Sequence, residues 1–292
     1  KILIVGFGKK EEFNANKMRE AVAKAVKKLQ QIHAKNACFD FDVNCDYGKS
    51  AAIGALIADY AFDKYKTEKA PRVDEITFAK FSQEEVKEGI IFGKALEFAR
   101  NLSNEPADFA TPSKLAQIAS NIEGVETKVY DRDAVERMGM GAYLAVAKGS
   151  VQPPMFIHMK YTGKNPKKKI AIIGKGICFD SGGLDLKPAS SMLTMRDDMS
   201  GAACVLGVMR ALKELEPDME VHGIIAACEN MPSGTSYKPG DILKAKNGKT
   251  IEIDNTDAEG RLTLADALCY ACELGVDEVI DIATLTGACV VA

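Results

Sequence analysis

Residues 170–187 carry the sequence IAIIGKGICFDSGGLDLK, in which an apolar run gives way to a polar loop. Residues 170–173 are all apolar, which is typical of a buried strand. Residues 174–187 follow directly and are polar and rich in glycine. In open α/β sheets, ligands bind beyond the carboxyl ends of the strands. We therefore expect a strand of an α/β sheet here, with functional residues in the loop that follows it.

The flanking sequence repeats this alternation of strands and helices. Strands are also predicted over residues 155–161, 221–227, 250–253 and 279–283. One helix is predicted from Ser200, as its N-cap, to Leu215, and another over residues 258–274, where Gly275 marks the end. The alternation predicts an α/β fold with a mostly parallel sheet flanked by helices.

The first third of the chain predicts a second, smaller domain. Residues 1–8 have the pattern of a strand, and residues 14–34 and 50–65 have the pattern of helices. A long helix over residues 84–102 could connect two domains. We expect an N-terminal α/β domain over residues 1–82, a connecting helix over 83–102 and the main domain over 103–292. The sequence lacks an initiator Met and stops after an apolar run, so we expect it to continue beyond both ends.

Composition excludes several functional classes. The 292 residues are 47% hydrophobic and 27% charged, with a formal net charge of -3. Lys and Arg are spread along the chain, which argues against a nucleic-acid surface, and no apolar run approaches the roughly 18 residues of a membrane span. Most of the eight Cys, including Cys178, Cys204 and Cys228, lie in apolar segments. Such cysteines are typical of core positions in a reducing compartment, so we expect a cytoplasmic protein.

Acidic residues concentrate in the polar segments that follow the predicted strands. These segments are residues 174–187, 254–261 and 284–287, and a further acidic cluster lies at 195–199. Carboxylates gathered in one cleft repel one another unless cations compensate them. A bridging carboxylate can hold two divalent ions roughly 3.5–4 Å apart and polarise a shared water. None of the three His lies in these segments, so oxygen ligands would dominate, which suits Mg, Mn or Zn.

Each motif also has a simpler explanation. Thr256-x-x-Glu259 matches a capping box at a helix start, although this leaves Asn255 and Arg261 unexplained. Residues 255–266 resemble a calcium-binding loop, but a strand and not a helix is predicted before them. A catalytically silent metal-binding module built on these residues remains the main rival to an enzyme.

Three further motifs suggest other classes of protein. The DSGG sequence at 180–183 resembles that of trypsin-like serine peptidases, which are all-β and need a positioned base. Cys269 and Cys272 have the spacing of a redox or zinc motif, but they lie within a predicted helix. A thiol redox protein is a second rival. Gly6-x-Gly8 suggests a dinucleotide fingerprint, but Glu11 replaces its third Gly.

Taken together, these segments resemble the cytosolic leucyl aminopeptidase family of hexameric two-metal exopeptidases. NTDAEGRL at 255–262 is identical to the signature octapeptide of that family, and GKG at 174–176 with FDSGG at 179–183 forms its other hallmark. Further matching blocks lie at 101–104, 229–234, 237–241 and 283–288. The resemblance is strong over residues 83–292 and loose over residues 1–82.

The resemblance implies a metal site with five protein ligands. Lys175, Asp180, Asp198 and Glu259 would hold a tightly bound divalent ion. Asp180, Asp257 and Glu259 would hold a more exchangeable one. The expected ions are Zn and/or Mn, with Mg or Co as alternatives at the exchangeable site.

The resemblance also implies catalytic and substrate-binding roles. Lys187 and Arg261 correspond to the catalytic Lys and Arg of the family. Arg261, with the backbone near Leu285, would hold a bicarbonate that acts as general base. Met195, Thr284 and Gly287 align with the pocket for the first side chain of the substrate.

The implied reaction is removal of the N-terminal residue, preferably leucine or another apolar residue, from short peptides by a water that two metals activate. The implied partners are peptides with a free N-terminus and further copies of the chain in a hexamer. No membrane or nucleic-acid partner is indicated.

Overall fold

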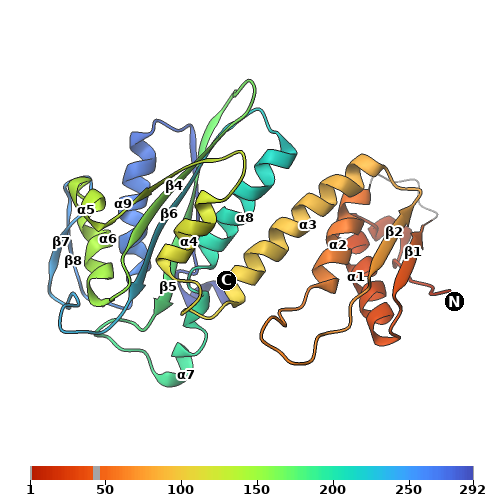
Figure 1. Cartoon of the computed structure of the whole chain (residues 1–292), viewed down its shortest axis with the longest axis horizontal. Helices are drawn as coiled ribbons and strands as arrows, with labels where there is room; N and C mark the ends of the chain where they lie inside the picture. Colours follow the sequence, from red (N-terminus) through yellow and green to blue (C-terminus); the bar gives the residue numbers. More distant parts are fainter. Residues whose placement is uncertain (1, 42–46, 292) are drawn as a thin grey trace. The chain divides into compact units, whose positions relative to one another are not determined.

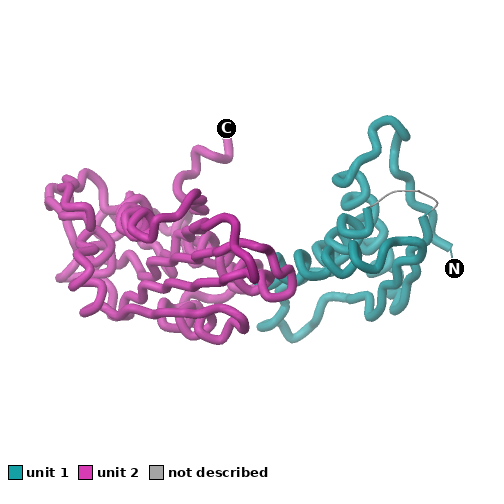
Figure 2. The backbone as a smooth tube through the Cα atoms, turned by 90° about the horizontal axis from the view of Figure 1, so that it is seen from above, with its two compact units in different colours: residues 1–98 teal, residues 99–292 magenta. Residues whose placement is uncertain are grey.

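The computed structural model describes residues 2–41 and 47–291. Lys1, Cys45 and Ala292, which enter the sequence predictions, lie outside the described residues. The chain forms two compact units, Lys1–Phe98 and Ala99–Ala292, coloured separately in Figure 2. In both units helices pack on β-strands, and the predicted α/β fold class is confirmed.

The N-terminal unit packs helices against a two-stranded parallel sheet. Its elements are η1 (Lys10–Glu12), α1 (Ala15–Gln31), β1 (Asn36–Asp40), α2 (Gly48–Asp59), β2 (Glu75–Ala79) and the start of α3 (Gln83–Asn104). Asn14 caps α1, because its side chain accepts the N–H groups of Asn16 and Lys17. The apolar side of α1 meets α2 and Phe39 of β1 in a common core.

Two predictions for this unit are wrong. Residues 2–8 form no strand: Ile2 and Ile4 are 93% and 90% exposed, and nothing among the described residues pairs with them. The predicted helix 50–65 ends at Asp59, where Tyr60 turns into extended backbone. Arg72 explains this end, because its guanidinium donates to the carbonyls of Asp59 and Ala61.

A five-stranded sheet forms the centre of the second unit, in the order β3–β4–β6–β5–β9. Its strands are β3 (Glu126–Tyr130), β4 (Met155–Thr162), β5 (Lys169–Asp180), β6 (Glu220–Asn230) and β9 (Glu278–Ile282). β6, β5 and β9 are parallel neighbours, whereas β4 is antiparallel to both β3 and β6. Four of the five strands therefore point the same way, as predicted for a mostly parallel sheet.

Helices cover both faces of this sheet, as Figure 1 shows. α4 (Pro112–Ser120) and α8 (Ser200–Leu215) lie on one face, and α6 (Gly141–Val146) and α9 (Gly260–Glu273) lie on the other. The remaining elements are α5 (Arg132–Arg137), η2 (Ala147–Gly149), α7 (Ala189–Met192), η3 (Met195–Asp197), β7 (Ile242–Lys244), β8 (Thr250–Glu252) and η4 (Gly287–Val290).

Glycines let the start of α8 approach the sheet closely. A Cβ on Gly201 of α8 would fall 2.0 Å from the carbonyl oxygen of Ile282, and one on Gly174 of β5 would fall 2.5 Å from the carbonyl oxygen of Gly201. No other residue fits such a backbone contact. This contact holds the residues just before α8 against the carboxyl ends of β5 and β9.

Three further predictions for the second unit need correction. β5 does not stop at Ile173 but runs to Asp180, because Gly174, Lys175 and Gly176 pair with β6. The strand predicted over 250–253 belongs to a separate β7–β8 hairpin and not to the main sheet. Ser200 is not the N-cap of α8: it lies inside the helix, and its hydroxyl donates to the carbonyl of Asp197.

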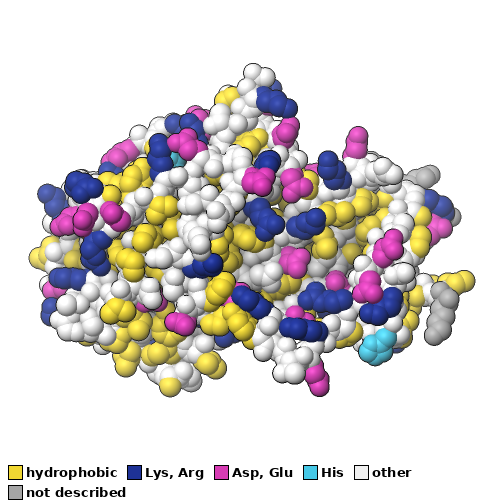
Figure 3. Space-filling view, in the orientation of Figure 1, with side chains coloured by type: hydrophobic (Ala, Val, Ile, Leu, Met, Phe, Trp, Pro, Cys, Tyr) yellow, Lys and Arg dark blue, Asp and Glu magenta, His cyan; other side chains and the backbone are white. Residues whose placement is uncertain are grey.

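The surface mixes charges of both signs. On the face drawn in Figure 3, basic and acidic side chains lie interspersed among apolar ones. Among residues 2–41 and 47–291, no helix is both long enough and apolar enough to cross a bilayer.

Candidate metal centre

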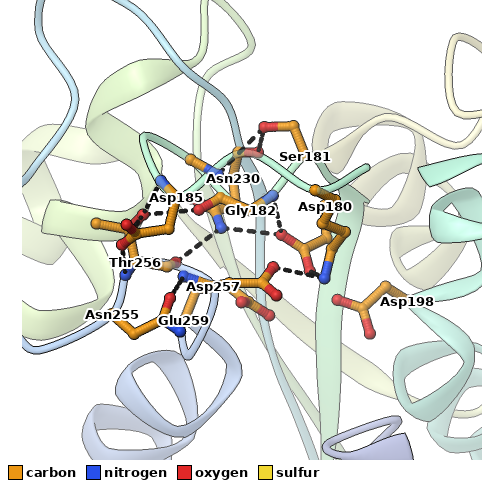
Figure 4. A network of polar contacts seen from close by, with 12 residues as sticks. Asp180, Ser181, Gly182, Asp185, Asp198, Asn230, Asn255, Thr256, Asp257 and Glu259 are labelled. Carbon is orange, nitrogen blue, oxygen red and sulfur yellow. Dashed lines mark hydrogen bonds and ion pairs between the residues drawn. The ribbon is translucent and has the colours of Figure 1, made fainter. Parts of the chain in front are cut away.

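Acidic side chains from three parts of the second unit meet at the carboxyl end of β5. Asp180 ends β5, Asp198 lies between η3 and α8, two residues before the helix, and Glu259 directly precedes α9. One oxygen from each of these carboxylates lies within 4.8 Å of the others. The three residues are 3%, 4% and 1% exposed. The structure thus brings together three of the predicted metal ligands, and Figure 4 shows them facing a common centre.

Two lysines link these carboxylates in pairs. The Nζ of Lys175, on β5, lies 2.8 Å from Asp198 Oδ2 and 2.9 Å from Glu259 Oε1. The Nζ of Lys187 lies 2.9 Å from Asp180 Oδ2 and 2.5 Å from Asp257 Oδ1. All five predicted ligands and one predicted catalytic residue therefore lie in two lysine-centred groups, which meet where Asp180 lies close to Asp198 and Glu259.

The charges in this network do not balance. Four carboxylates face two ammonium groups, and burial raises the pKa of Asp198 to about 7 although Lys175 opposes this. Burial also raises the pKa of Glu259, against the pull of Lys175. Burial alone would lower the pKa of Lys175, but the charges of Asp198 and Glu259 outweigh it and raise that pKa. A site with this excess of buried negative charge favours additional cations.

One carboxylate oxygen of Glu259 indicates whether the site suits a metal ion. Glu259 Oε2 is buried and has no hydrogen-bond partner among the described residues, whereas Lys175 pairs with Oε1 of the same carboxylate. A buried, unpaired carboxylate oxygen costs several kcal/mol unless a cation or donor satisfies it. Hard divalent ions prefer oxygen ligands of this kind. The donor set therefore fits a divalent metal.

A second set of polar residues, which the sequence did not predict, supports the ligands. Asn230 at the end of β6 donates to Asp180 Oδ1 at 2.9 Å and to the carbonyl of Thr256 at 3.0 Å. The hydroxyl of Thr256 donates to the carbonyl of Gly182 at 2.7 Å, and its N–H donates to Asp185 Oδ2 at 2.7 Å. The available signal was a polar residue three positions after the buried strand predicted over residues 221–227.

Two glycines make the turn after Asp180. Gly182 and Gly183 have φ of +88° and +69°, which L-residues with side chains rarely adopt. A Cβ on Gly182 would also fall 2.4 Å from the carbonyl oxygen of Asp185. The turn returns the chain toward Lys187, whose N–H donates to the carbonyl of Ser181 at 2.9 Å.

The other predicted residues lie less centrally. Thr284 contacts the site directly, because its hydroxyl donates to Asp198 Oδ1 at 2.7 Å and its carbonyl accepts from Lys175 Nζ at 3.0 Å. Met195 is half-buried in η3, and Leu285 and Gly287 are exposed. Arg261 is exposed at the start of α9, where the described residues provide it with no hydrogen bond or ion pair. Thr284 thus contacts the ligands, whereas the roles predicted for Met195, Arg261, Leu285 and Gly287 stay predictions.

The rival motifs are engaged in structural roles. Asp266, which would close a calcium-binding loop, accepts the N–H of Lys246 on Oδ1 and the N–H of Tyr143 on Oδ2, at 2.8 and 2.9 Å. Ser181 is 2% exposed, and its hydroxyl donates to the carbonyl of Asn230. Cys269 and Cys272 lie within α9 and are free, so they do not occupy the helix N-terminus where a reactive thiolate is stabilised.

Comparison with known proteins gives a consistent result. Residues 97–292 match the model of the cytosol aminopeptidase family catalytic domain, and residues 1–69 match the model of its N-terminal domain. Proteins named "Probable cytosol aminopeptidase" from Persephonella marina and Aquifex aeolicus are each 48% identical to the chain, over 308 and 303 residues. The alignments cover 100% of this chain but 62% and 61% of those relatives. The chain thus spans about three fifths of the length of the relatives that it matches.

Proposed function

Because the chain belongs to the cytosol aminopeptidase family, we propose that it carries the active site of a metal-dependent aminopeptidase. The reaction is hydrolysis of the first peptide bond of short peptides, with leucine or another apolar residue preferred at the N-terminus. The observation that carries this proposal is the convergence of Asp180, Asp198 and Glu259 around an unpartnered carboxylate oxygen. A silent calcium module and a thiol redox protein lack comparable support.

The proposed metal site uses five side chains. Lys175, Asp180, Asp198 and Glu259 would hold one divalent ion, and Asp180, Asp257 and Glu259 would hold a second. Zn and Mn suit this donor set, with Mg or Co as alternatives at the second position. Bound there, such ions would lower the pKa of a water and polarise the scissile carbonyl. Lys175 can serve as a ligand only after its ammonium group, which lies between Asp198 and Glu259, loses a proton.

The remaining roles belong to groups around the ligands. Lys187 reaches the same centre, where its ammonium would stabilise negative charge on the carbonyl oxygen of the substrate. Arg261, exposed and without an ion pair among the described residues, would hold an anion such as bicarbonate together with the backbone at Leu285. Met195, Thr284 and Gly287 would border the pocket for the first side chain.

The proposal extends to the setting of the enzyme. We assign catalysis to a domain over residues 103–292, behind a connecting helix over 83–102 and an N-terminal domain over 1–82. The partners would be peptides with a free N-terminus and other copies of the chain in a hexamer, in the cytoplasm. Neither a membrane nor a nucleic acid enters the proposal.

Release of a chromophore from a leucyl amide tests this function. With Mn or Zn present the full chain should cleave the amide, and a chelator should abolish cleavage. Lys187→Ala should reduce kcat by at least about 100-fold, as expected for loss of oxyanion stabilisation. Lys164→Ala, at an exposed lysine, serves as the matched control. Cleavage that survives the chelator, or that a thiol blocker abolishes, would refute the proposal.

A further inference from the structure

Asn230 is a fully buried polar residue at the centre of the site. It closes β6, is 0% exposed and lies between Asp180 and Thr256 in Figure 4. Its side chain donates to Asp180 Oδ1 at 2.9 Å and to the carbonyl oxygen of Thr256 at 3.0 Å. Both partners can only accept, so the atom that faces them must be the amide nitrogen. Both N–H groups of the amide are therefore committed to the site.

The contact with Asp180 restrains the rotation of that carboxylate. Oδ1 accepts from Asn230 and from the N–H of Gly182, at 2.9 Å each, and Oδ2 faces the Nζ of Lys187 at 2.9 Å. The two oxygens are thus held from opposite sides. A neutral amide suits this position, because it orients the carboxylate without neutralising its charge. A basic side chain in place of Asn230, in addition to Lys187, would compete with a metal ion for this carboxylate, and an acidic side chain would repel it.

Asn230 also connects the two segments that carry the ligands. Its side chain holds the carbonyl of Thr256, next to Asp257, while its own carbonyl accepts the N–H of Ser181 at 3.0 Å and the hydroxyl of Ser181 at 2.7 Å. The hydroxyl of Tyr237 donates to the same Thr256 carbonyl at 2.7 Å. The link to Thr256 therefore has a second support from a side chain. Asp180 Oδ1 also accepts the backbone N–H of Gly182, but among the described residues Asn230 is the only side chain that donates to it.

We propose that Asn230 is a positioning residue, which sets the orientation of the Asp180 carboxylate and so strengthens its binding of divalent metal. This inference rests on the proposed function. Residues that orient metal ligands typically change metal affinity or activity by 10- to 100-fold when they are removed. Asn230 does not itself touch the substrate or the reacting atoms; it acts through Asp180.

Two substitutions separate this role from simple support of the loop. Asn230→Ala removes the contacts with both Asp180 and Thr256. Tyr237→Phe removes only the second hydrogen bond to the Thr256 carbonyl. Mn²⁺ is titrated by calorimetry into the metal-free full chain of each variant, and kcat and KM for a leucyl amide are measured at saturating Mn²⁺. We expect Asn230→Ala to weaken Mn²⁺ binding by roughly 10- to 100-fold and to lower kcat more than it raises KM. Tyr237→Phe should stay within about threefold of wild type in each quantity.

The outcomes distinguish failure of the role inferred for Asn230 from failure of the proposed function. If Mn²⁺ affinity and kcat fall equally in both variants, Asn230 acts only through Thr256. If both quantities are unchanged in Asn230→Ala, Asn230 does not position Asp180. Either result overturns the inference. If Asn230→Ala does not fold, the nearly isosteric Asn230→Asp replaces it. Its kcat at saturating Mn²⁺ should fall at least tenfold, and a kcat within threefold of wild type would overturn the inference. A wild-type chain that neither binds Mn²⁺ nor cleaves the amide would instead refute the proposed function.

Discussion

Gly260 lies directly against the side chain of Lys175. A Cβ on Gly260 would fall 2.6 Å from Cε and 2.8 Å from Nζ of that lysine. Real Cβ atoms do not approach so closely, so the glycine reserves the space in which the amine meets Asp198 and Glu259. The first residue of α9 thereby controls the position of a predicted ligand on β5.

Gly260→Ala should therefore impair the site more than the fold. The added methyl group would push Lys175 Nζ away from its carboxylate partners, and a misplacement of about 1 Å can cost roughly 100-fold in rate. We expect leucyl amide cleavage to fall at least about 100-fold, together with loss of one bound metal ion by elemental analysis. Gly234→Ala is the control, because Gly234 has open space around its Cβ position. Wild-type cleavage by Gly260→Ala would contradict the assignment of Lys175.

The neighbouring acids Asp197 and Asp198 permit a matched comparison. Only Asp198 faces Lys175 and accepts the hydroxyl of Thr284, whereas Asp197 lies in η3 away from that network. We expect Asp198→Asn to lose one ion per chain and Asp197→Asn to retain both, as measured by elemental analysis after dialysis.

Asp180→Asn should abolish two-metal occupancy, because Asp180 would serve both ions. Two ions still bound in Asp180→Asn would show that it does not bridge.

Thiol chemistry should be irrelevant to activity. Cys178 and Cys228 are fully buried, and burial raises the pKa of both thiols well above its usual value. Such thiols do not react as thiolates at neutral pH. An alkylating reagent should leave amide cleavage within about twofold of the untreated protein, and so should Cys272→Ser at the exposed end of the CxxC sequence. Loss of cleavage in either case would revive the redox alternative.

The central strands could be predicted from sequence for physical reasons. β5 and β6 are buried on both faces, so their apolar runs are nearly continuous and easy to detect. The extension of β5 through Gly174–Asp180 could not be predicted, because Gly and Lys have weak strand propensity and the pairing with β6 is a tertiary effect. Edge strand β3, with the polar sequence ETKVY, gave no apolar run and was missed.

The supporting residues of the site were harder to predict than its ligands. Acidic residues after strands suggested a metal site, and the family resemblance supplied its individual ligands. The role of Asn230 depends on β5 and β6 being adjacent in space, which sequence order does not reveal. The roles predicted for Arg261, Leu285 and Gly287 rest on the family resemblance alone. The domain limits at residues 82 and 102 likewise remain predictions.

Asp266 joins two distant parts of the chain, and its removal should destabilise the fold. Its carboxylate accepts the N–H of Tyr143, in the first turn of α6, and the N–H of Lys246 after β7. Hydrogen bonds to a charged group each contribute about 1.5–3 kcal/mol, so Asp266→Ala should lower the free energy of unfolding by about 3 kcal/mol. Urea unfolding measures this change. Asp133→Ala, at an exposed residue of α5, should change the free energy by less than about 0.5 kcal/mol. An unchanged midpoint in Asp266→Ala would contradict this structural role.

Glu220, His222, His158 and Tyr270 form a chain of polar side chains, in which the two histidines are buried and the end members are partly buried. Glu220 can only accept, so the His222 Nε2–H donates to it at 2.9 Å. His222 Nδ1 must then accept from His158 Nε2–H at 2.8 Å, and His158 Nδ1 must accept from the hydroxyl of Tyr270 at 2.9 Å. Both imidazoles are neutral in this arrangement. A proton added to His222 would place two N–H groups against each other between the rings.

The free energy of unfolding should therefore fall in mild acid, because His158 is protonated more readily in the unfolded chain. Burial, followed by the charge of a protonated His222, lowers the pKa of His158 from 6.5 to about 4; Lys128 and Lys160 act in the same direction, and Glu126 opposes them. Because the unfolded chain takes up the proton more readily, stability is complete above about pH 6.5 and declines as pH falls toward 4. Linkage predicts that the lowered pKa of His158 reduces the free energy of unfolding by about 2 kcal/mol between pH 7 and pH 5. Urea unfolding of the metal-free chain at both values measures it. His158→Gln, which does not titrate, should reduce the pH dependence by that amount, and an unchanged dependence would show that His158 is not responsible.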